Sequence, residues 1–221
     1  MNATPIADVP DPSNGKIPEP PPPDADWASI RAWRKQTRSA LIHERSQLPP
    51  HTRRVHNDRV RRHLLDEVDL RRFRSIGFYY PIRGELGFLD IARDLVARGG
   101  IAALPVVVER SAPVEFWRWS PGDRMRRGLW DIPIPAEREL VTPEALVVPL
   151  VGFDSQRYRL GYGGGYYDRT LASMNPRPFC VGVGFSTSRL PTIFPQAHDI
   201  PMDAIVTDQS FIGAVSRLPP I

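Results

Sequence analysis

The sequence has a single cysteine, Cys180, and no long apolar stretch. Among its 221 residues, no segment approaches the roughly 18 apolar residues that a membrane-spanning helix needs. One cysteine cannot form an internal disulfide, and its apolar surroundings predict a small buried core residue rather than a catalytic thiol. The amino end lacks the basic-then-apolar pattern of a signal peptide, so we expect a cytoplasmic protein that does not interact with membranes.

Lysine is also scarce, because only two of the 29 basic residues are lysine. The formal net charge is +4. A basic chain can bind nucleic acid, but the same charge suits an enzyme whose substrates carry several negative charges. The planar guanidinium of arginine matches carboxylate and phosphate oxygens better than an ammonium group does. The composition therefore indicates an anionic partner without identifying it.

The chain divides into a tail and one domain. Residues 1–26 hold eight of the 25 prolines and almost no large apolar side chains, so we expect a disordered tail there. Residues 27–221 form a domain of ordinary size. Apolar periodicity within it predicts helices over residues 27–47, 52–70, 89–98 and 166–172, and strands over residues 74–80, 101–108, 114–119, 146–151 and 179–185. This alternation predicts a single three-layer α/β domain, with a largely parallel central sheet and helices on both faces.

The segment from Arg157 to Arg169 has the composition of a phosphate-binding loop. Its glycines are Gly161, Gly163, Gly164 and Gly165, and glycine allows positive φ angles and close approach of a ligand to the backbone. A helix that begins at Tyr166 would direct N–H groups and the positive end of its dipole to the same point. The spacing matches neither the dinucleotide fingerprint nor the Walker loop. The alternative is a tight turn that binds nothing.

Charged residues elsewhere suggest further parts of a site. Arg34 and Arg38 lie one helical turn apart and can converge on one anion, or they can form a solvated face. Glu85 follows the first strand, at the edge where open α/β sheets bind ligands. Asp154 and Asp168 are candidate ligands of Mg²⁺, which takes one or two protein oxygens beside a polyphosphate. For Asp168, the alternative is a helix cap.

These segments resemble the signature of the 5-formyltetrahydrofolate cyclo-ligase family. The resemblance covers about Trp27 to Asp208 and consists of five motifs in the family's order. They are the basic pair on the first helix, Gly84-Glu85, the segment Trp130 to Pro135, the strand and glycine-rich segment from Leu146 to Arg169, and the final segment from Leu190 to Asp208. The resemblance implies the cyclo-ligase fold, which is NagB-RpiA-CoA-transferase-like.

The resemblance also implies a reaction, the ATP- and Mg²⁺-dependent conversion of 5-formyltetrahydrofolate to 5,10-methenyltetrahydrofolate with release of ADP and phosphate. The formyl oxygen of an amide is a poor leaving group, so ATP would phosphorylate it before N10 closes the ring. Phosphoryl transfer depends mainly on positioning and charge neutralisation. This accounts for the lack of a recognisable serine, cysteine or histidine nucleophile constellation.

Residue roles follow from the same resemblance. Nucleotide-binding positions are Arg34, Arg38, Arg157, Gly161, Tyr162, Gly163, Gly164, Gly165 and Tyr166. Folate-binding positions are Glu85, Trp130 and Tyr167, and the positions nearest the chemistry are Tyr167, Asp168 and Arg169. Asp154 or Asp168 would hold Mg²⁺, and we expect a monomer.

Two departures from the family pattern concern the folate half of the site. Ile134 stands where a polar or acidic residue is usual, and Val114 or Phe116 replaces a common methionine. A non-catalytic or re-purposed paralogue that binds another anion is therefore one alternative. The other is an RNA-binding module built on the arginine-rich helices, although the chain lacks the aromatic signatures of common RNA-binding domains.

Overall fold

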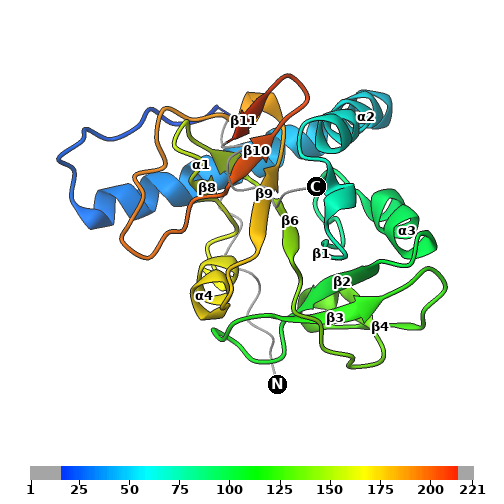
Figure 1. The fold of residues 1–221 in the computed structure, drawn as a ribbon. Coiled ribbons are helices and arrows are strands. Elements are labelled where there is room, and N and C mark those ends of the chain that lie inside the picture. The colour runs from blue at the N-terminus through cyan, green and yellow to red at the C-terminus, as the bar shows by residue number, and fades with distance from the viewer. Residues whose placement is uncertain (1–15, 214–221) are drawn as a thin grey trace.

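A seven-stranded sheet forms the centre of the protein in the computed structural model, which describes residues 16–213 (Figure 1). Its strand order is β11-β10-β9-β6-β1-β2-β3. The strands are β1 (Ser75–Gly77), β2 (Ile101–Val106), β3 (Glu115–Trp119), β6 (Ala145–Pro149), β9 (Phe179–Val183), β10 (Ala204–Val206) and β11 (Phe211–Gly213). The five inner strands run parallel, and the edge strands β3 and β11 are antiparallel. The predicted largely parallel sheet is confirmed, whereas β11 was not predicted.

Residues of the inner strands alternate between two apolar clusters, one on each face of the sheet. In β6, Ala145 and Val147 join the first cluster, and Leu146 and Val148 join the second. Helices α2 (Pro50–Asp66) and α3 (Leu89–Ala97) contribute to the first cluster, and α4 (Tyr166–Ser173) contributes to the second. Figure 1 shows α2 and α3 on one side of the sheet and α4 on the other. The prediction of helices on both faces is therefore confirmed.

Helix α1 (Trp27–Gln47) has the predicted bounds and lies beyond the carboxyl end of β6. It begins after Asp26, whose side chain accepts a hydrogen bond of 2.7 Å from the backbone N–H of Ser29. Its buried positions recur at helical spacing. Two of them, Trp33 and Leu41, pack in a third cluster with Val151, Leu160, Leu190 and Ile193. This packing brings the arginines of α1 to the edge of the sheet where the glycine-rich segment lies.

Two small sheets and three short 3₁₀ helices lie outside the central sheet. They are β4 (Met125–Arg127) with β5 (Pro133–Pro135), β7 (Gly152–Phe153) with β8 (Arg159–Leu160), and η1 (Leu70–Arg72), η2 (Leu129–Asp131) and η3 (Ser186–Ser188). None of these elements was predicted. The β7–β8 ribbon begins just after β6 and leads directly into the glycine-rich segment.

The ends of the chain are described only in part. Most of the predicted disordered tail lies outside the described residues, so that prediction and the domain bounds 27–221 stay predictions. Within the described segment, Trp33 Nε1 donates to the backbone oxygen of Pro18 at 3.1 Å. Cys180 is fully buried, in agreement with the predicted core role. No helix within residues 16–213 is long and apolar enough to cross a membrane.

Candidate functional site

The glycine-rich segment forms a loop, residues 161–165, between the β7–β8 ribbon and α4. Gly163 and Gly165 have φ angles of 91° and 62°, which most side chains disfavour. Gly163 and Gly164 are exposed. Within the described part of the chain, no hydrogen bond reaches the backbone N–H groups of residues 162–165. The loop therefore presents four adjacent donors that can bind an anion.

Two arginine side chains lie against this loop and bind its carbonyl groups. Arg38 Nε donates to Gly161 O at 2.6 Å, and Arg169 NH2 donates to Gly164 O at 2.6 Å. A Cβ added at Gly163 would lie 3.3 Å from Arg38 Cζ. The guanidinium groups thus face the loop from α1 and from α4.

Arg38 has no carboxylate partner among the described residues. Burial and the positive charge of neighbouring Arg34 lower the pKa of Arg38 to about 10. A partly buried cation beside a second cation is stabilised when an anion binds between or beside them. Together with the four free amides of the loop, Arg38 fits a polyphosphate group.

The other arginines predicted to bind the nucleotide have protein partners. Arg34 donates to Ile193 O at 2.7 Å and forms an ion pair of 2.6 Å with Asp199. Arg157 Nε donates to Met202 O at 3.0 Å. Both side chains therefore hold the segment of residues 193–202 beside the loop. Their predicted contacts with a nucleotide stay predictions.

Asp154, one of the two predicted metal ligands, is buried and organises the chain around it. Its Oδ1 accepts from the backbone N–H groups of Gln156 and Tyr158 at 3.0 and 3.1 Å, and its Oδ2 accepts from that of Ile193 at 3.1 Å. Only 2% of the residue is exposed. These contacts give the carboxylate a structural role, and its predicted role as a ligand of Mg²⁺ stays a prediction.

Asp168, the other predicted metal ligand, lies at the start of α4. It forms an ion pair of 2.9 Å with the buried guanidinium of Arg159, and its Oδ1 accepts from Ile200 N at 3.1 Å. Its side chain is 17% exposed, so one side of the carboxylate can still meet a ligand. The described residues contain no group of three or more histidine, cysteine, aspartate or glutamate side chains that could hold a metal. The role of Asp168 as a metal ligand stays a prediction, as it does for Asp154.

Glu85 is buried at the other end of the site. Its Oε2 accepts from Ile82 N at 2.9 Å, and its Oε1 accepts from the hydroxyl of Tyr162 at 2.7 Å. Arg45 lies 3.6 Å from the same Oε1 and also donates to the Tyr162 hydroxyl. Burial raises the pKa of Glu85, and the positive charge of Arg45 partly opposes this shift. The hydrogen bond from Tyr162 thus connects Glu85, the predicted substrate-binding residue, to the glycine loop.

Arg45 is a residue whose role in the site was not predicted. Its guanidinium also donates to Arg83 O at 3.0 Å and to Leu150 O at 3.1 Å. The residue is only 5% exposed. The available signal was spacing, because the buried positions Trp33, Thr37 and Leu41 of α1 continue by one more step of four to Arg45.

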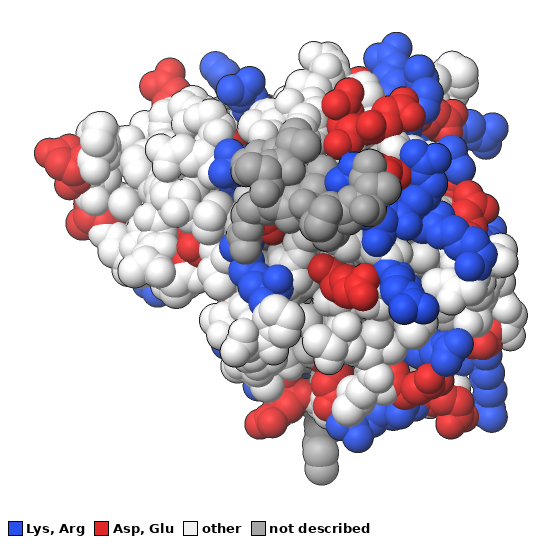
Figure 2. Space-filling view, viewed as in Figure 1, with Lys and Arg blue, Asp and Glu red and all other residues white. Residues whose placement is uncertain are grey.

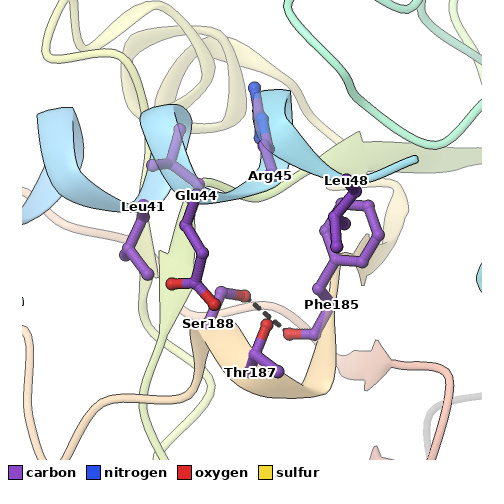
Figure 3. Close-up of a pocket in the computed structure, with 8 residues that line it drawn as sticks. Leu41, Glu44, Arg45, Leu48, Phe185, Thr187 and Ser188 are labelled. Atoms are coloured by element: carbon purple, nitrogen blue, oxygen red, sulfur yellow. Dashed lines mark hydrogen bonds between the residues drawn. The ribbon is translucent and has the colours of Figure 1, made fainter. Parts of the chain in front are cut away.

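A shallow hollow lies behind Arg45, between α1 and η3. It is lined by Leu41, Glu44, Arg45, Leu48, Val151, Phe185, Thr187 and Ser188. Figure 3 shows the side chain of Glu44 pointing toward Ser188, whereas that of Arg45 leaves α1 on the opposite side. The guanidinium of Arg45 therefore serves Glu85 and Tyr162 rather than this hollow.

Tyr167 and Trp130, the predicted aromatic contacts, lie on different elements around the loop. Tyr167 is on α4, where burial and the negative charge of Glu85 raise its pKa, and Arg159 lies over its ring at 5.5 Å. Trp130 packs edge-on against Tyr166 with ring centroids 5.5 Å apart. Trp130 and Asp131 have φ angles of 58° and 61°. A left-handed backbone conformation is strained for residues other than glycine, and such residues concentrate at ligand-binding sites.

The two departures from the family pattern belong to the core. Ile134 is 5% exposed and packs in a cluster with Val106 and Trp117. Val114 and Phe116 lie in the cluster on the second face of the sheet. Packing therefore explains the apolar residues at all three positions.

Arginines on the surface are mixed with carboxylates. Figure 2 shows basic and acidic side chains interspersed over the half of this face that carries α2 and α3. Arg61 pairs with Asp90 at 2.6 Å, and Arg118 pairs with Glu139 at 3.0 Å. On this face, the pattern differs from the continuous basic band that a nucleic-acid backbone requires.

Comparison with known families identifies one match. Residues 30–208 match the 5-formyltetrahydrofolate cyclo-ligase family. The 5-formyltetrahydrofolate cyclo-ligase of Haemophilus influenzae is 27% identical over 176 residues, which are 76% of this chain and 94% of that protein. The protein of the same name from Escherichia coli K12 is 38% identical over 140 residues, 60% of this chain and 77% of that protein.

Solved structures agree with the sequence comparison. The NMR structure of Aquifex aeolicus 5,10-methenyltetrahydrofolate synthetase superposes with a TM-score of 0.70 at 29% identity, and the match covers 80% of this chain and 91% of that one. A 5,10-methenyltetrahydrofolate synthetase from Mycoplasma pneumoniae has the same fold, with a TM-score of 0.64 at 22% identity over 81% of this chain and 98% of that one.

Proposed function

The chain belongs to the 5-formyltetrahydrofolate cyclo-ligase family, and we propose that it is an ATP-dependent ligase that cyclises 5-formyltetrahydrofolate to 5,10-methenyltetrahydrofolate. In this reaction the formyl oxygen attacks the terminal phosphorus of ATP, and ADP leaves. N10 then attacks the activated formyl carbon and loses its proton, a carbon–nitrogen bond forms, and phosphate leaves with the former formyl oxygen. ATP supplies the group that turns a poor leaving group into a good one.

The glycine loop and Arg38 form the nucleotide end of the proposed site. The free N–H groups of residues 162–165 would donate to phosphate oxygens, at the amino end of α4. Arg38 would supply a full positive charge from the side of α1, and Arg169 would supply a second one from α4. Both arginines already touch the loop, so little rearrangement is needed before the phosphates are neutralised.

Mg²⁺ would bring charge neutralisation to the phosphate oxygens. Asp168 is the one predicted ligand whose carboxylate is still partly exposed, at 17%. Mg²⁺ commonly keeps several waters and takes only one or two protein oxygens beside a polyphosphate. Asp168 is therefore sufficient as the protein's contribution, and Asp154 is better explained as a structural residue.

Glu85, Tyr167 and Trp130 form the folate end. Glu85 offers a buried carboxylate that can accept hydrogen bonds from the polar edge of a pterin ring. Aromatic faces such as that of Trp130 suit flat rings. Tyr167 lies on α4 directly after the loop, where it can order the substrate relative to the phosphates. No side-chain nucleophile is required, because the substrate's own oxygen and nitrogen atoms form the new bonds.

One observation carries this proposal: among residues 16–213, the amides of residues 162–165 have no partner and stand beside Arg38, a cation without a carboxylate partner. Amides of consecutive residues in an exposed loop can donate to the oxygens of a phosphate group. The test is to mix the purified protein with 5-formyltetrahydrofolate, ATP and Mg²⁺ and to follow the absorbance of the methenyl product. We expect a rise that requires all three, and a folded protein that produces no rise would refute the proposal.

A further inference from the structure

Tyr162 takes part in both ends of the site. Its backbone N–H is one of the free donors of the glycine loop, which the proposed function assigns to phosphate binding. Its hydroxyl points the other way and donates to Oε1 of Glu85 at 2.7 Å. Tyr162 therefore connects the loop amides proposed to bind the nucleotide to Glu85, which is proposed to bind the folate.

Arg45 fixes the position of this link. It donates to the Tyr162 hydroxyl while its other N–H groups donate to Arg83 O and Leu150 O. Leu150 immediately follows β6, and Arg83 belongs to the turn that carries Glu85. The guanidinium is thus attached to the sheet and to the Glu85 turn at once, and it polarises the hydroxyl toward the carboxylate.

The backbone on either side of Tyr162 is glycine. A Cβ at Gly161 would meet nothing within 4 Å, and Gly163 has a φ angle of 91°. Arg38 and Arg169 bind the carbonyl groups on either side of Tyr162, its amide is free to bind a ligand, and its side chain is held in a buried hydrogen-bonded chain. Any movement of the loop toward phosphates changes the hydrogen bond to Glu85.

We propose that Tyr162, supported by Arg45, is a positioning residue that couples nucleotide binding to folate binding. Closure of residues 162–165 on the phosphates sets the hydroxyl of Tyr162, and the hydroxyl then orients the Glu85 carboxylate for the folate. This inference rests on the proposed function, because both ligands come from it. Coupling of this kind is reciprocal, so each ligand raises the affinity for the other by the same factor.

The test measures four dissociation constants by isothermal titration. A non-hydrolysable ATP analogue with Mg²⁺ and 5-formyltetrahydrofolate are each titrated into free protein and into protein saturated with the other ligand. For the unmodified protein, we expect each ligand to strengthen binding of the other by about fivefold or more. For Tyr162→Phe, which keeps the backbone amide and removes only the hydroxyl, we expect a coupling factor of about 1.

Two further variants separate coupling from general damage. Tyr158→Phe is the matched control, because the hydroxyl of Tyr158 makes no hydrogen bond with the described residues; it should keep the full coupling factor. Arg45→Lys keeps the positive charge but cannot reach Arg83, Leu150 and Tyr162 together, so it should also lower the coupling factor. Thermal melts confirm that each variant is folded.

The outcomes distinguish this inference from the proposed function. If the unmodified protein binds neither ligand, the proposed function fails and the coupling fails with it. If it binds both ligands independently, or if Tyr162→Phe retains the coupling factor, the coupling role of Tyr162 is wrong and the proposed function stands.

Discussion

The glycine loop at residues 161–165 and the charged residues beside it differ in what they bind. Asp154, Arg157, Arg159 and Asp168 each have a protein partner. The amides of the loop have none within the described residues. The flanking charges therefore shape the loop, and its backbone is left to meet a ligand. A charged residue near a binding motif is as often part of the scaffold as part of the site.

The largest expected effect is on stability, and it concerns Asp154, one of the charged residues that shape the loop. Asp154→Ala removes three hydrogen bonds to backbone amides from a buried carboxylate, so we expect a loss of about 3 to 5 kcal/mol in the free energy of unfolding. Urea denaturation measures this loss. Asp90→Ala is the control: the side chain of Asp90 is 46% exposed and pairs with Arg61 on the surface, so its removal should cost less than about 1 kcal/mol.

A different result for Asp154→Ala would indicate that Asp154 binds Mg²⁺. Near-normal stability together with loss of Mg²⁺-dependent nucleotide binding would make Asp154 a metal ligand, and the comparison between scaffold and loop would fail at that residue.

The next largest effect is expected on nucleotide affinity, and it separates the roles of two arginines that lie one turn apart on α1. Arg38→Ala removes a cation that has no carboxylate partner within the described part of the chain, so we expect nucleotide binding to weaken by about 1.5 to 3 kcal/mol with little change in stability. Arg34→Ala breaks the ion pair with Asp199 and should instead lower stability by about 1 to 3 kcal/mol. Titration of each variant with nucleotide, beside a urea denaturation, separates the two roles. Equal losses of nucleotide affinity would show that both arginines contact the phosphates.

Much of the fold could be predicted from the sequence, because long apolar patterns dominate it. Helix α1 was predicted with both ends correct, since an apolar stripe and a following proline pair define it. Strand β11 and the β7–β8 ribbon were missed. Their strands have two or three residues, which is too short for a period to show. Such strands depend on tertiary contacts rather than on their own sequence.

The sequence indicated which residues lie near the candidate site, but it did not show which of them have partners within the protein. The glycines were identified from composition, Glu85 from its position after the first strand, and Trp130 from the family resemblance. The structure places all of them around one loop, and their roles stay predictions. The sequence could not show that Arg34 is paired with Asp199, since the two residues are far apart along the chain and meet only in the fold. Arg45 was missed for the related reason that an arginine on a helix is usually expected to face solvent.

A smaller effect is expected from the backbone of the loop. Gly163→Ala places a Cβ on a residue with a φ angle of 91° and 3.3 Å from Arg38 Cζ, so we expect a loss of about 1 to 2 kcal/mol in nucleotide binding. At Gly161 a Cβ would meet nothing within 4 Å, and Gly161→Ala should therefore cost less. Calorimetric titration of both variants makes the comparison. A larger loss for Gly161→Ala would contradict the assignment of Gly163 as the point of closest approach.

The smallest expected effect is a change of slope in the pH dependence of stability, and it tests the buried end of the site. Burial raises the pKa of Glu85 above its ordinary value of 4.5. The folded state then holds this proton more tightly than the unfolded state, so stability falls as the pH rises from the unfolded pKa through the folded one.

Glu85→Gln removes the titrating group while keeping the shape of the side chain. The difference in unfolding free energy between the unmodified protein and Glu85→Gln should therefore shift in favour of the variant as the pH rises above the ordinary carboxyl pKa of 4.5. Urea denaturation at several pH values measures this difference, and other carboxylates cancel because they are common to both proteins. Unlike the charges that flank the glycine loop, Glu85 would then be a carboxylate held in the folded state at a cost in stability, as expected of a residue kept for its substrate. A difference that stays constant with pH would instead place Glu85 among the scaffold charges.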